Sequence, residues 1–259
     1  MPKDSDAKRL SKQRYSQFAD GYVSSQTHAE GNDLDILLEL AEPQKDWHMI
    51  DIATGGGHTA LKFSPFVNHV TATDLTKKML QKAGEYTRRE GAANISIKTA
   101  DAEALPFKDG SFDLAACRIA AHHFPDPQQF LGETWRVLKP GGIFLFQDHV
   151  LPDDMEAAAI IDDFEKQRDP SHNRAYSFQA WVDMFTAAGF TVQHTQEITK
   201  RHIFLDWALR QGCSDITIQH LIEIVYNAPP TARLWMMPEK WGSQDASFTN
   251  HHLIIRAQK

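Results

Sequence analysis

The chain has 259 residues, of which 42% are hydrophobic, which is enough for one large α/β domain with additional elements. Its formal net charge of −7 argues against a nucleic-acid backbone as the main partner. The only cysteines, Cys117 and Cys213, indicate no disulfide framework, and Cys117, inside an apolar run, is expected to be a buried thiol. The N-terminus lacks the apolar segment of a secretory signal, and no apolar run reaches membrane-spanning length. We therefore expect a cytoplasmic protein with no membrane span.

The first chemical signal is a glycine motif. Residues 49–52 form an apolar run, interrupted by Asp51, that leads into the three glycines of residues 55–57. This pattern is typical of a buried parallel strand, then a tight turn, then a helix whose first N–H groups point at a ligand. The motif predicts a nucleotide-binding loop.

Three interpretations of the loop compete. Residues 55–60 fit the G-x-G-x-x-G/A fingerprint of dinucleotide-binding proteins. However, a carboxylate at the end of the strand would repel a pyrophosphate, and Asp51 supplies one. Asp51 suits a ligand with a positive amino group and no phosphate, such as S-adenosylmethionine (SAM). A glycine turn that binds nothing is the third interpretation, because short glycine motifs also occur by chance.

Further acids follow at the ends of the next strands. Asp74 ends the apolar run of residues 70–75, about 20 residues after the glycines, where a carboxylate can accept both hydroxyls of a ribose. Asp101 lies in a third expected strand, residues 95–103, and is placed to accept a hydrogen bond from an adenine amino group. Each acid alone could be a solvated residue, but the ordered series favours a cofactor site.

The remaining pattern alternates strands with helices. Thr76 is a plausible N-cap for the second helix, and Gly91 follows its end. This alternation predicts a doubly wound, mainly parallel sheet with ligands at the carboxyl ends of its strands. The further expected strands are residues 111–118, 189–194 and 248–257, and residues 138–148 are expected to form a turn followed by the fifth strand. The helices between the early strands are residues 58–66, 76–90 and 126–137.

Taken together, these motifs resemble the class I SAM-dependent methyltransferases, most closely the branch with the ubiquinone and menaquinone biosynthesis methyltransferases. The motifs are Asp51-x-x-x-Gly55-x-Gly57, Asp74, Asp101-Ala102-Glu103-x-Leu105-Pro106-Phe107, Phe112-Asp113 and Leu138-Lys139-Pro140-Gly141-Gly142. One departure is Ala53, which stands where the family loop D-x-G-x-G-x-G has its first glycine. Alanine is tolerated there if its φ angle is negative, and we expect a negative φ.

The resemblance implies an α/β, Rossmann-like methyltransferase fold with a doubly wound, mainly parallel seven-stranded sheet and helical cap insertions. Its last two strands would form a closing antiparallel pair. It also implies an organisation along the chain, although the final insertion could instead be helices that merely extend the core. The expected parts are an N-terminal helical lid (1–46), a SAM-binding core (47–150), and the rest of the sheet (151–259) with substrate-cap insertions at about 150–188 and 200–247.

The implied reaction moves a methyl group from SAM to a small organic acceptor and leaves S-adenosylhomocysteine; a homodimer is compatible with the resemblance. Two alternatives stay open: an NAD(P)-dependent oxidoreductase, which Asp51 and Asp101 oppose, and a non-catalytic protein that binds SAM or a nucleoside. The residues expected to bind the cofactor are Asp51, Gly55, Gly57, Asp74, Leu75, Met79, Asp101, Ala102, Arg118 and Tyr22.

Methyl transfer needs an aligned nucleophile, a dry site and, for some acceptors, a base. His122 and His123 follow the fourth strand, where class I enzymes commonly place substrate contacts, and a histidine can take a phenol, enol or amine proton. Adjacent side chains rarely face the same space, so we favour His123 as the catalytic base and assign His122 to the acceptor. The alternative is a pair of histidines that only form hydrogen bonds in a loop or helix cap.

The acceptor site is expected to include the end of the fifth strand, Asp148, and the polar turn of residues 168–174. Arg168, His172 and Arg174 in this turn can clamp an anionic acceptor, although they can equally form a solvated surface. We expect no metal site, because the pairs His122-His123 and His251-His252 and the distant cysteines lack zinc-type spacing.

Overall fold

The structure is a computed structural model that describes residues 2–23 and 32–259. In chain order the elements are α1 (Pro2–Val23), α3 (Asn32–Ala41), β1 (His48–Ile52), α4 (His58–Phe63), η1 (Ser64–Phe66), β2 (His69–Asp74), α5 (Lys77–Arg89), β3 (Ile95–Thr99), β4 (Phe112–Arg118), η2 (Ala121–His123), α6 (Pro127–Val137), β5 (Leu138–Leu151), α7 (Met155–Arg168), β6 (Tyr176–Ser177), α8 (Phe178–Ala187), β7 (Thr191–Ile203), α9 (Phe204–Leu209), α10 (Asp215–Asn227), α11 (Pro230–Met236) and β8 (Ser247–Gln258).

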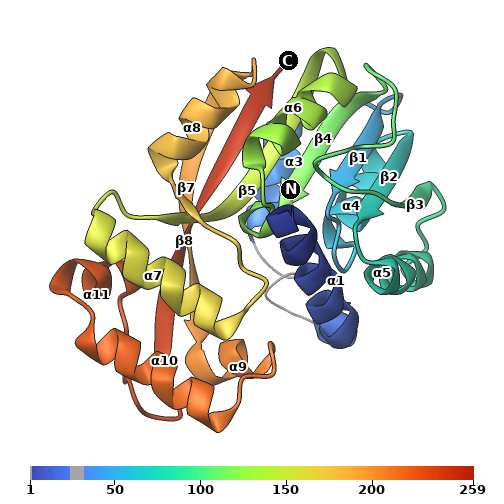
Figure 1. Ribbon diagram of the computed structural model, residues 1–259. Helices are drawn as coiled ribbons and strands as arrows, with labels where there is room; N and C mark the ends of the chain where they lie inside the picture. The colour runs from blue at the N-terminus through green and yellow to red at the C-terminus, as the bar shows by residue number, and fades with distance from the viewer. Residues whose placement is uncertain (1, 24–31) are drawn as a thin grey trace.

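Seven strands follow one another across the main sheet in the order β3-β2-β1-β4-β5-β8-β7 (Figure 1). The first five are parallel, whereas β8 runs antiparallel to β5 and β7 antiparallel to β8. The short strand β6 pairs with β5 outside this path. The predicted doubly wound α/β fold and its closing antiparallel pair are confirmed.

Helices cover both faces of the sheet because the strands are apolar on both sides. Along β5, Phe144 and Phe146 pack with Phe130 of α6 and Phe185 of α8, whereas Leu145 belongs to the cluster that α3 and α4 cover. Consecutive side chains of a strand point to opposite faces, so one strand contributes to two cores. This arrangement leaves the carboxyl ends of β1, β2, β3 and β4 at one edge.

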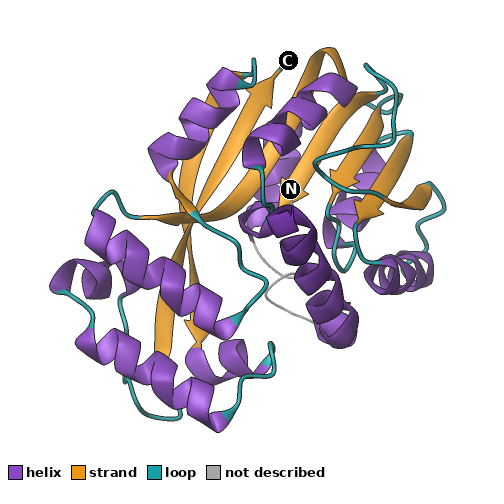
Figure 2. Cartoon of the chain, in the orientation of Figure 1, coloured by secondary structure: helices purple, strands orange, loops and turns teal. Residues whose placement is uncertain are grey.

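Strands β7 and β8 continue past the Rossmann-like sheet, and α7, α9, α10 and α11 surround their far halves (Figure 2). This part has its own core, in which Trp207 stacks on Phe164 with ring centres 5.0 Å apart and meets Phe248 edge-on at 4.8 Å. The expected strand of residues 189–194 corresponds to β7, which is longer than predicted. The ladder between β7 and β8 continues to Ile203, which extends the strand by several residues.

Some other boundaries also differ from the prediction. The third strand ends at Thr99, because the backbone of Asp101 turns and its carbonyl accepts a hydrogen bond from the Ala104 N–H at 3.0 Å. The expected helix of residues 58–66 divides at Ser64 into α4 and η1, with Pro65 in the first turn of η1. Thr76 is the N-cap residue of α5, as predicted, although its side chain makes no capping bond.

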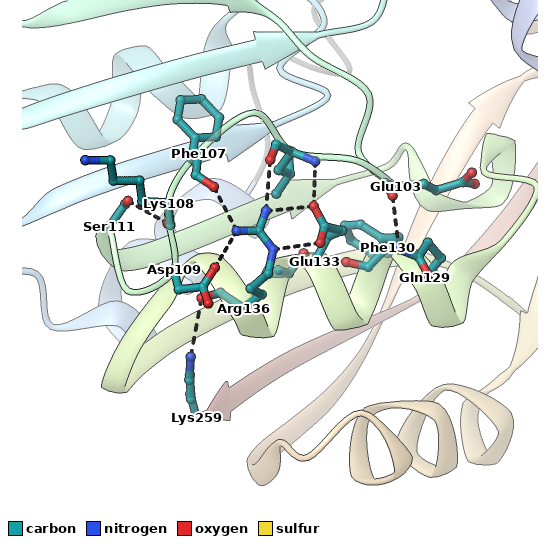
Figure 3. Close-up of polar contacts among 12 residues, drawn as sticks. Glu103, Phe107, Lys108, Asp109, Ser111, Gln129, Phe130, Glu133, Arg136 and Lys259 are labelled. Atoms are coloured by element: carbon teal, nitrogen blue, oxygen red, sulfur yellow. Dashed lines mark hydrogen bonds and ion pairs between the residues drawn. The ribbon is translucent and has the colours of Figure 1, made fainter.

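The loop that carries Asp101 is fastened to α6 by Arg136 (Figure 3). The Arg136 guanidinium donates to the carbonyl oxygens of Leu105 and Phe107 at 2.9 and 2.8 Å and forms two bonds with the Glu133 carboxylate at 2.7 and 2.8 Å. Glu133 in turn accepts the Leu105 N–H at 2.7 Å. These bonds hold the backbone of the loop against a rigid helix.

Cys117 is fully buried, as predicted, and both cysteines are free thiols. Burial raises the pKa of the Cys117 thiol well above its usual value. None of the helices in residues 2–23 and 32–259 has the combination of length and apolarity that crossing a membrane requires.

Candidate active site

Two adjacent cavities lie at the carboxyl ends of the strands. The first encloses about 1030 Å³, open mouth included, between α1 and the segments that follow β1, β2, β3 and β4. The second, of about 660 Å³, lies between the segment after β4, the end of β5, α7 and the β7–β8 pair. Tyr15, Ile119 and His123 line both cavities, so they mark the junction.

Eight of the ten expected cofactor residues line the first cavity: Asp51, Gly55, Asp74, Leu75, Met79, Asp101, Ala102 and Arg118. Gly57 does not. A Cβ added to it would lie 3.2 Å from Ala83 Cβ and 3.1 Å from Thr87 Cγ2, so Gly57 lets the glycine loop approach α5. The side chain of Tyr22 lies outside the part of the chain that the structure describes.

The conformation of Ala53 differs from the prediction. Its φ angle is +54°, in the left-handed region, so the expectation of a negative φ is wrong. The loop reverses direction here, and the next residue, Thr54, donates its N–H to the Thr73 carbonyl at 2.7 Å. This position favours glycine, and alanine there costs roughly 1–2 kcal/mol.

Asp51 is buried beneath the glycine loop. Its Oδ2 accepts the Thr54 hydroxyl at 2.5 Å and the Ala60 N–H at 3.1 Å, the latter from the first turn of α4. Burial is the main cause that raises the pKa of Asp51 to about 7, although these donors and Arg118 oppose the rise. A cationic ligand group beside Asp51 would stabilise its ionised form.

Asp74 joins the end of β2 to the glycine loop. Its Oδ1 accepts the Thr76 N–H at 2.8 Å and its Oδ2 accepts the Gly55 N–H at 3.2 Å. Burial raises the pKa of Asp74, and the backbone donors limit the rise. Asp74 still lines the first cavity, as do its neighbours Gly55 and Leu75.

Asp101 forms an ion pair with a residue of α1. Lys8 donates to Asp101 Oδ2 at 2.7 Å and contacts Glu103 Oε2 at 2.5 Å, while Asp101 Oδ1 accepts the Glu103 N–H at 3.0 Å. Lys8, Ser11 and Tyr15 therefore bring α1 into the wall of the first cavity. No local pattern in the sequence indicates this contact, because 93 residues separate Lys8 from Asp101.

Arg118 is tied to two other elements at the cavity wall. Its guanidinium donates to Asp33 Oδ2 of α3 at 2.8 Å and to Thr59 Oγ1 of α4 at 3.1 Å. Lys200 of β7 donates to the same Asp33 oxygen at 2.7 Å. Burial alone would raise the pKa of Asp33, but the two cations lower it to about 2. The sequence analysis did not identify Asp33 or Lys200.

His123 lies in η2 at the junction of the cavities. Its Nδ1 donates to the Ser171 carbonyl at 2.9 Å, which leaves the Nε2 lone pair to accept the Tyr15 hydroxyl at 2.5 Å. Burial lowers the pKa of His123, so the ring is neutral at pH 7. This geometry gives a neutral imidazole whose basic nitrogen is directed at a cavity-lining phenol.

Only some of the residues expected to bind the acceptor line the second cavity. His122, Arg168 and His172 line the second cavity, whereas Asp148 is fully buried behind it. The Arg168 guanidinium already forms hydrogen bonds within the protein, because its Nε and Nη2 donate to the Trp207 carbonyl at 3.1 and 2.9 Å. Arg174 is exposed and lines neither of the two cavities, because its guanidinium packs over the Tyr176 ring, 5.1 Å from its centre.

The second cavity contains several residues that the sequence analysis did not identify as a group. They come from five separate elements, and only the fold brings them together. They are His149, Glu165, Asp169, Lys200, His202, Trp207, Arg210, Asn250 and His252.

The relationship to known proteins follows from comparison of the whole chain. The sequence is 36% identical over 246 residues to YcgJ, an uncharacterised methyltransferase of Bacillus subtilis (strain 168), covering 95% of this chain and 97% of that protein. The chain belongs to the methyltransferase family. The methyltransferase domain family matches residues 50–146, which span the segment from β1 to β5.

Two further relatives agree with this assignment. The ubiquinone/menaquinone biosynthesis C-methyltransferase UbiE of Zymomonas mobilis is 26% identical over 174 residues, which cover 60% of this methyltransferase and 72% of the relative. A crystal structure from Bacillus halodurans C-125, described as a methyltransferase, superposes with a TM-score of 0.85 and is 34% identical. It covers 88% of this chain and 99% of that one. The predicted family and enzyme class are confirmed.

Proposed function

We propose that this methyltransferase transfers a methyl group from SAM to a small organic acceptor, with SAM in the first cavity and the acceptor in the second. The observation that carries the proposal is that Asp51, Asp74 and Asp101, from three neighbouring strand ends, line one cavity together with Gly55. These carboxylates match the three polar parts of SAM, namely its amino group, ribose and adenine. Asp51, beside the glycine loop, does not suit a pyrophosphate, and this disfavours a nicotinamide cofactor, whereas Asp74 would suit the ribose of either cofactor.

Each carboxylate has a distinct part in the proposed complex. Asp51 pairs with the ammonium group, Asp74 accepts the ribose hydroxyls, and Asp101 accepts the adenine amino group. Because Lys8 bonds both Asp101 and Glu103, adenine binding requires Lys8 to shift toward Glu103. We therefore infer that α1 adjusts when the cofactor binds.

Bound SAM supplies a methyl group that is already strongly electrophilic, so the protein's task is to align the acceptor, exclude water and remove a proton where needed. The acceptor's nucleophilic atom would face the first cavity at the junction that Tyr15, Ile119 and His123 form. There the Tyr15 oxygen takes the acceptor proton as its own proton passes to His123 Nε2. The bond from His123 Nδ1 to the Ser171 carbonyl stabilises the imidazolium that results.

Ligand binding and turnover test the proposal separately. Calorimetric titrations with S-adenosylhomocysteine and with NAD⁺ identify the cofactor, and we expect binding of the first alone. Turnover of a metabolite panel with methyl-labelled SAM then identifies the acceptor. Binding of NAD⁺ in preference to the adenosyl ligand would refute the cofactor assignment, and SAM binding without transfer to any acceptor would support a regulatory protein.

A further inference from the structure

The second cavity holds an unusual concentration of imidazoles. His122, His149 and His172 have ring centres 4.4, 5.4 and 5.5 Å apart, and His252 lies 6.2 Å from His149. All four rings are at least nine-tenths buried. Burying neutral imidazoles side by side needs polar partners for their nitrogens, because an unpaired buried polar atom is costly.

Several of these nitrogens have no such partner. Among residues 2–23 and 32–259, His149 Nε2 and both ring nitrogens of His252 are buried without a hydrogen bond. A neutral imidazole nitrogen with a free lone pair is a metal ligand.

Asp148 organises the group from behind. Its Oδ1 accepts His122 Nδ1–H at 2.7 Å. Asp148 also accepts the backbone N–H groups of His122 and His149 at 3.0 and 2.8 Å. The Asp148 carboxylate and the His122 ring therefore already face each other, and an ion bound between them would replace the proton that they share.

We propose that His122, His149 and Asp148 form a binding site for one divalent transition-metal ion of the zinc type, beside the acceptor cavity. One donor atom from each of the three residues lies within 4.8 Å of the other two. Ligand atoms around tetrahedral zinc are about 3.3 Å apart, so side-chain shifts of about 1.5 Å complete the site. This inference concerns a site that cofactor binding and methyl transfer do not require.

The charges around the site permit a cation. The cavity wall carries Lys200, Arg168 and Arg210, but Lys200 is paired with Asp33. Arg168 donates to a backbone carbonyl and lies beside Glu165 and Asp169 in the same wall. Asp148 adds a negative charge directly behind the imidazoles. The spacing of histidines along the chain gives no hint of this site, since residues 122 and 149 come from different strand ends.

Because His123 lies next to His122, with ring centres 4.1 Å apart, an ion at this site would be adjacent to the junction of the cavities. A bound ion there would lower the pKa of an oxygen or nitrogen that coordinates it. Acceptors with a hydroxyl or amine group that can coordinate the ion are therefore the class that this cavity fits.

The test is metal binding by protein that carries no histidine tag and has been stripped with a chelator. We expect one Zn²⁺ per chain by competition with a chromophoric chelator, and tetrahedral visible absorption with Co²⁺. His149→Ala should weaken Zn²⁺ binding about tenfold or more, and Asp148→Asn about 10- to 100-fold. His220→Ala, which removes an exposed histidine of α10, is the matched control and should leave affinity unchanged.

Affinity for S-adenosylhomocysteine is measured on the same samples and should be the same in wild type and His149→Ala, since His149 does not line the first cavity. If His149→Ala does not fold, His149→Gln replaces it. Absence of bound Zn²⁺ in the wild type, or equal losses in the His149 and His220 variants, would overturn the metal site. Neither result would affect the proposed cofactor site.

Discussion

The Tyr15 hydroxyl of α1 lies 2.5 Å from Nε2 of His123, which comes from η2 after β4. This contact lies at the junction of the two cavities and joins the N-terminal helix to the proposed catalytic base. Tyr15→Phe keeps the ring but breaks the proton path, so we expect turnover to fall about 100-fold while affinity for S-adenosylhomocysteine changes little.

Tyr226→Phe is the matched control for this experiment, because the exposed Tyr226 hydroxyl of α10 donates to the Trp241 carbonyl and lines neither of the two cavities. His123→Ala should lower turnover at least as much as Tyr15→Phe. The measurement is steady-state turnover with the acceptor that the metabolite panel identifies. Full activity of both the Tyr15 and His123 variants would remove the pair from the reaction.

The raised pKa of Asp51 makes cofactor binding depend on pH. Pairing with an ammonium group requires the carboxylate, so affinity for S-adenosylhomocysteine should be constant above about pH 7. Below that pH it should fall, by at most about tenfold per pH unit. Asp51→Asn should bind more weakly and without this dependence. Titrations between pH 5.5 and 8.5 test the expectation, and a wild-type affinity that rises toward low pH would contradict it.

The raised pKa of Asp51 also makes the free energy of unfolding depend on pH when no ligand is bound. The pKa of Asp51 in the folded chain, about 7, exceeds its usual value of 3.8, so the fold favours the protonated form. The contribution of Asp51 to the free energy of unfolding is therefore complete below about pH 4 and is lost as the pH rises toward 7. Comparing wild type with Asp51→Asn by denaturant unfolding at several pH values isolates this contribution. A difference that does not change with pH would show an ordinary pKa.

Ala53→Gly should stabilise the protein. Glycine relieves the left-handed strain, which stabilises the folded protein by roughly 1–2 kcal/mol. It also raises the entropy of the unfolded chain, which destabilises the folded protein by about 0.4–1 kcal/mol, so the expected net gain is about 0.5–1 kcal/mol. Ala158→Gly, near the start of α7, is the matched control and should destabilise by about 0.5–1 kcal/mol. The free energy of unfolding in urea measures both, and equal losses would contradict the strain at Ala53.

Arg136→Lys should loosen the loop that carries Asp101. Lysine keeps the charge but has three donors in place of the planar five-donor guanidinium, so it cannot replace all the bonds that Arg136 makes to the two carbonyls and to both oxygens of Glu133. The free energy of unfolding should therefore fall by about 1.5–3 kcal/mol. Hydrogen exchange of residues 101–111 should also become faster. Arg89→Lys changes an exposed arginine and should alter neither quantity. Unchanged exchange in the loop would show that Arg136 does not hold it.

The sequence predicted the features that depend on neighbouring residues. The strand ends at Asp51 and Asp74, the glycine loop and the order of elements follow from local patterns, and all lie where expected. The contacts of Lys8 and Tyr15 with the cavity depend on where α1 packs, which no local pattern encodes. The histidines of the second cavity likewise meet only because β5, β8 and the segment after β4 converge. The φ angle of Ala53 could not be predicted, since alanine rarely adopts the left-handed region.

The most direct test of the proposed cofactor site is a calorimetric titration of Asp74→Ala with S-adenosylhomocysteine, alongside wild type and Asp245→Ala. Asp245 is an exposed aspartate in the segment between α11 and β8. Loss of charge-assisted bonds to the ribose should weaken binding by about tenfold or more in Asp74→Ala. Asp245→Ala should bind like the wild type. A folded Asp74→Ala protein with wild-type affinity would show that the adenosyl cofactor does not bind at the end of β2.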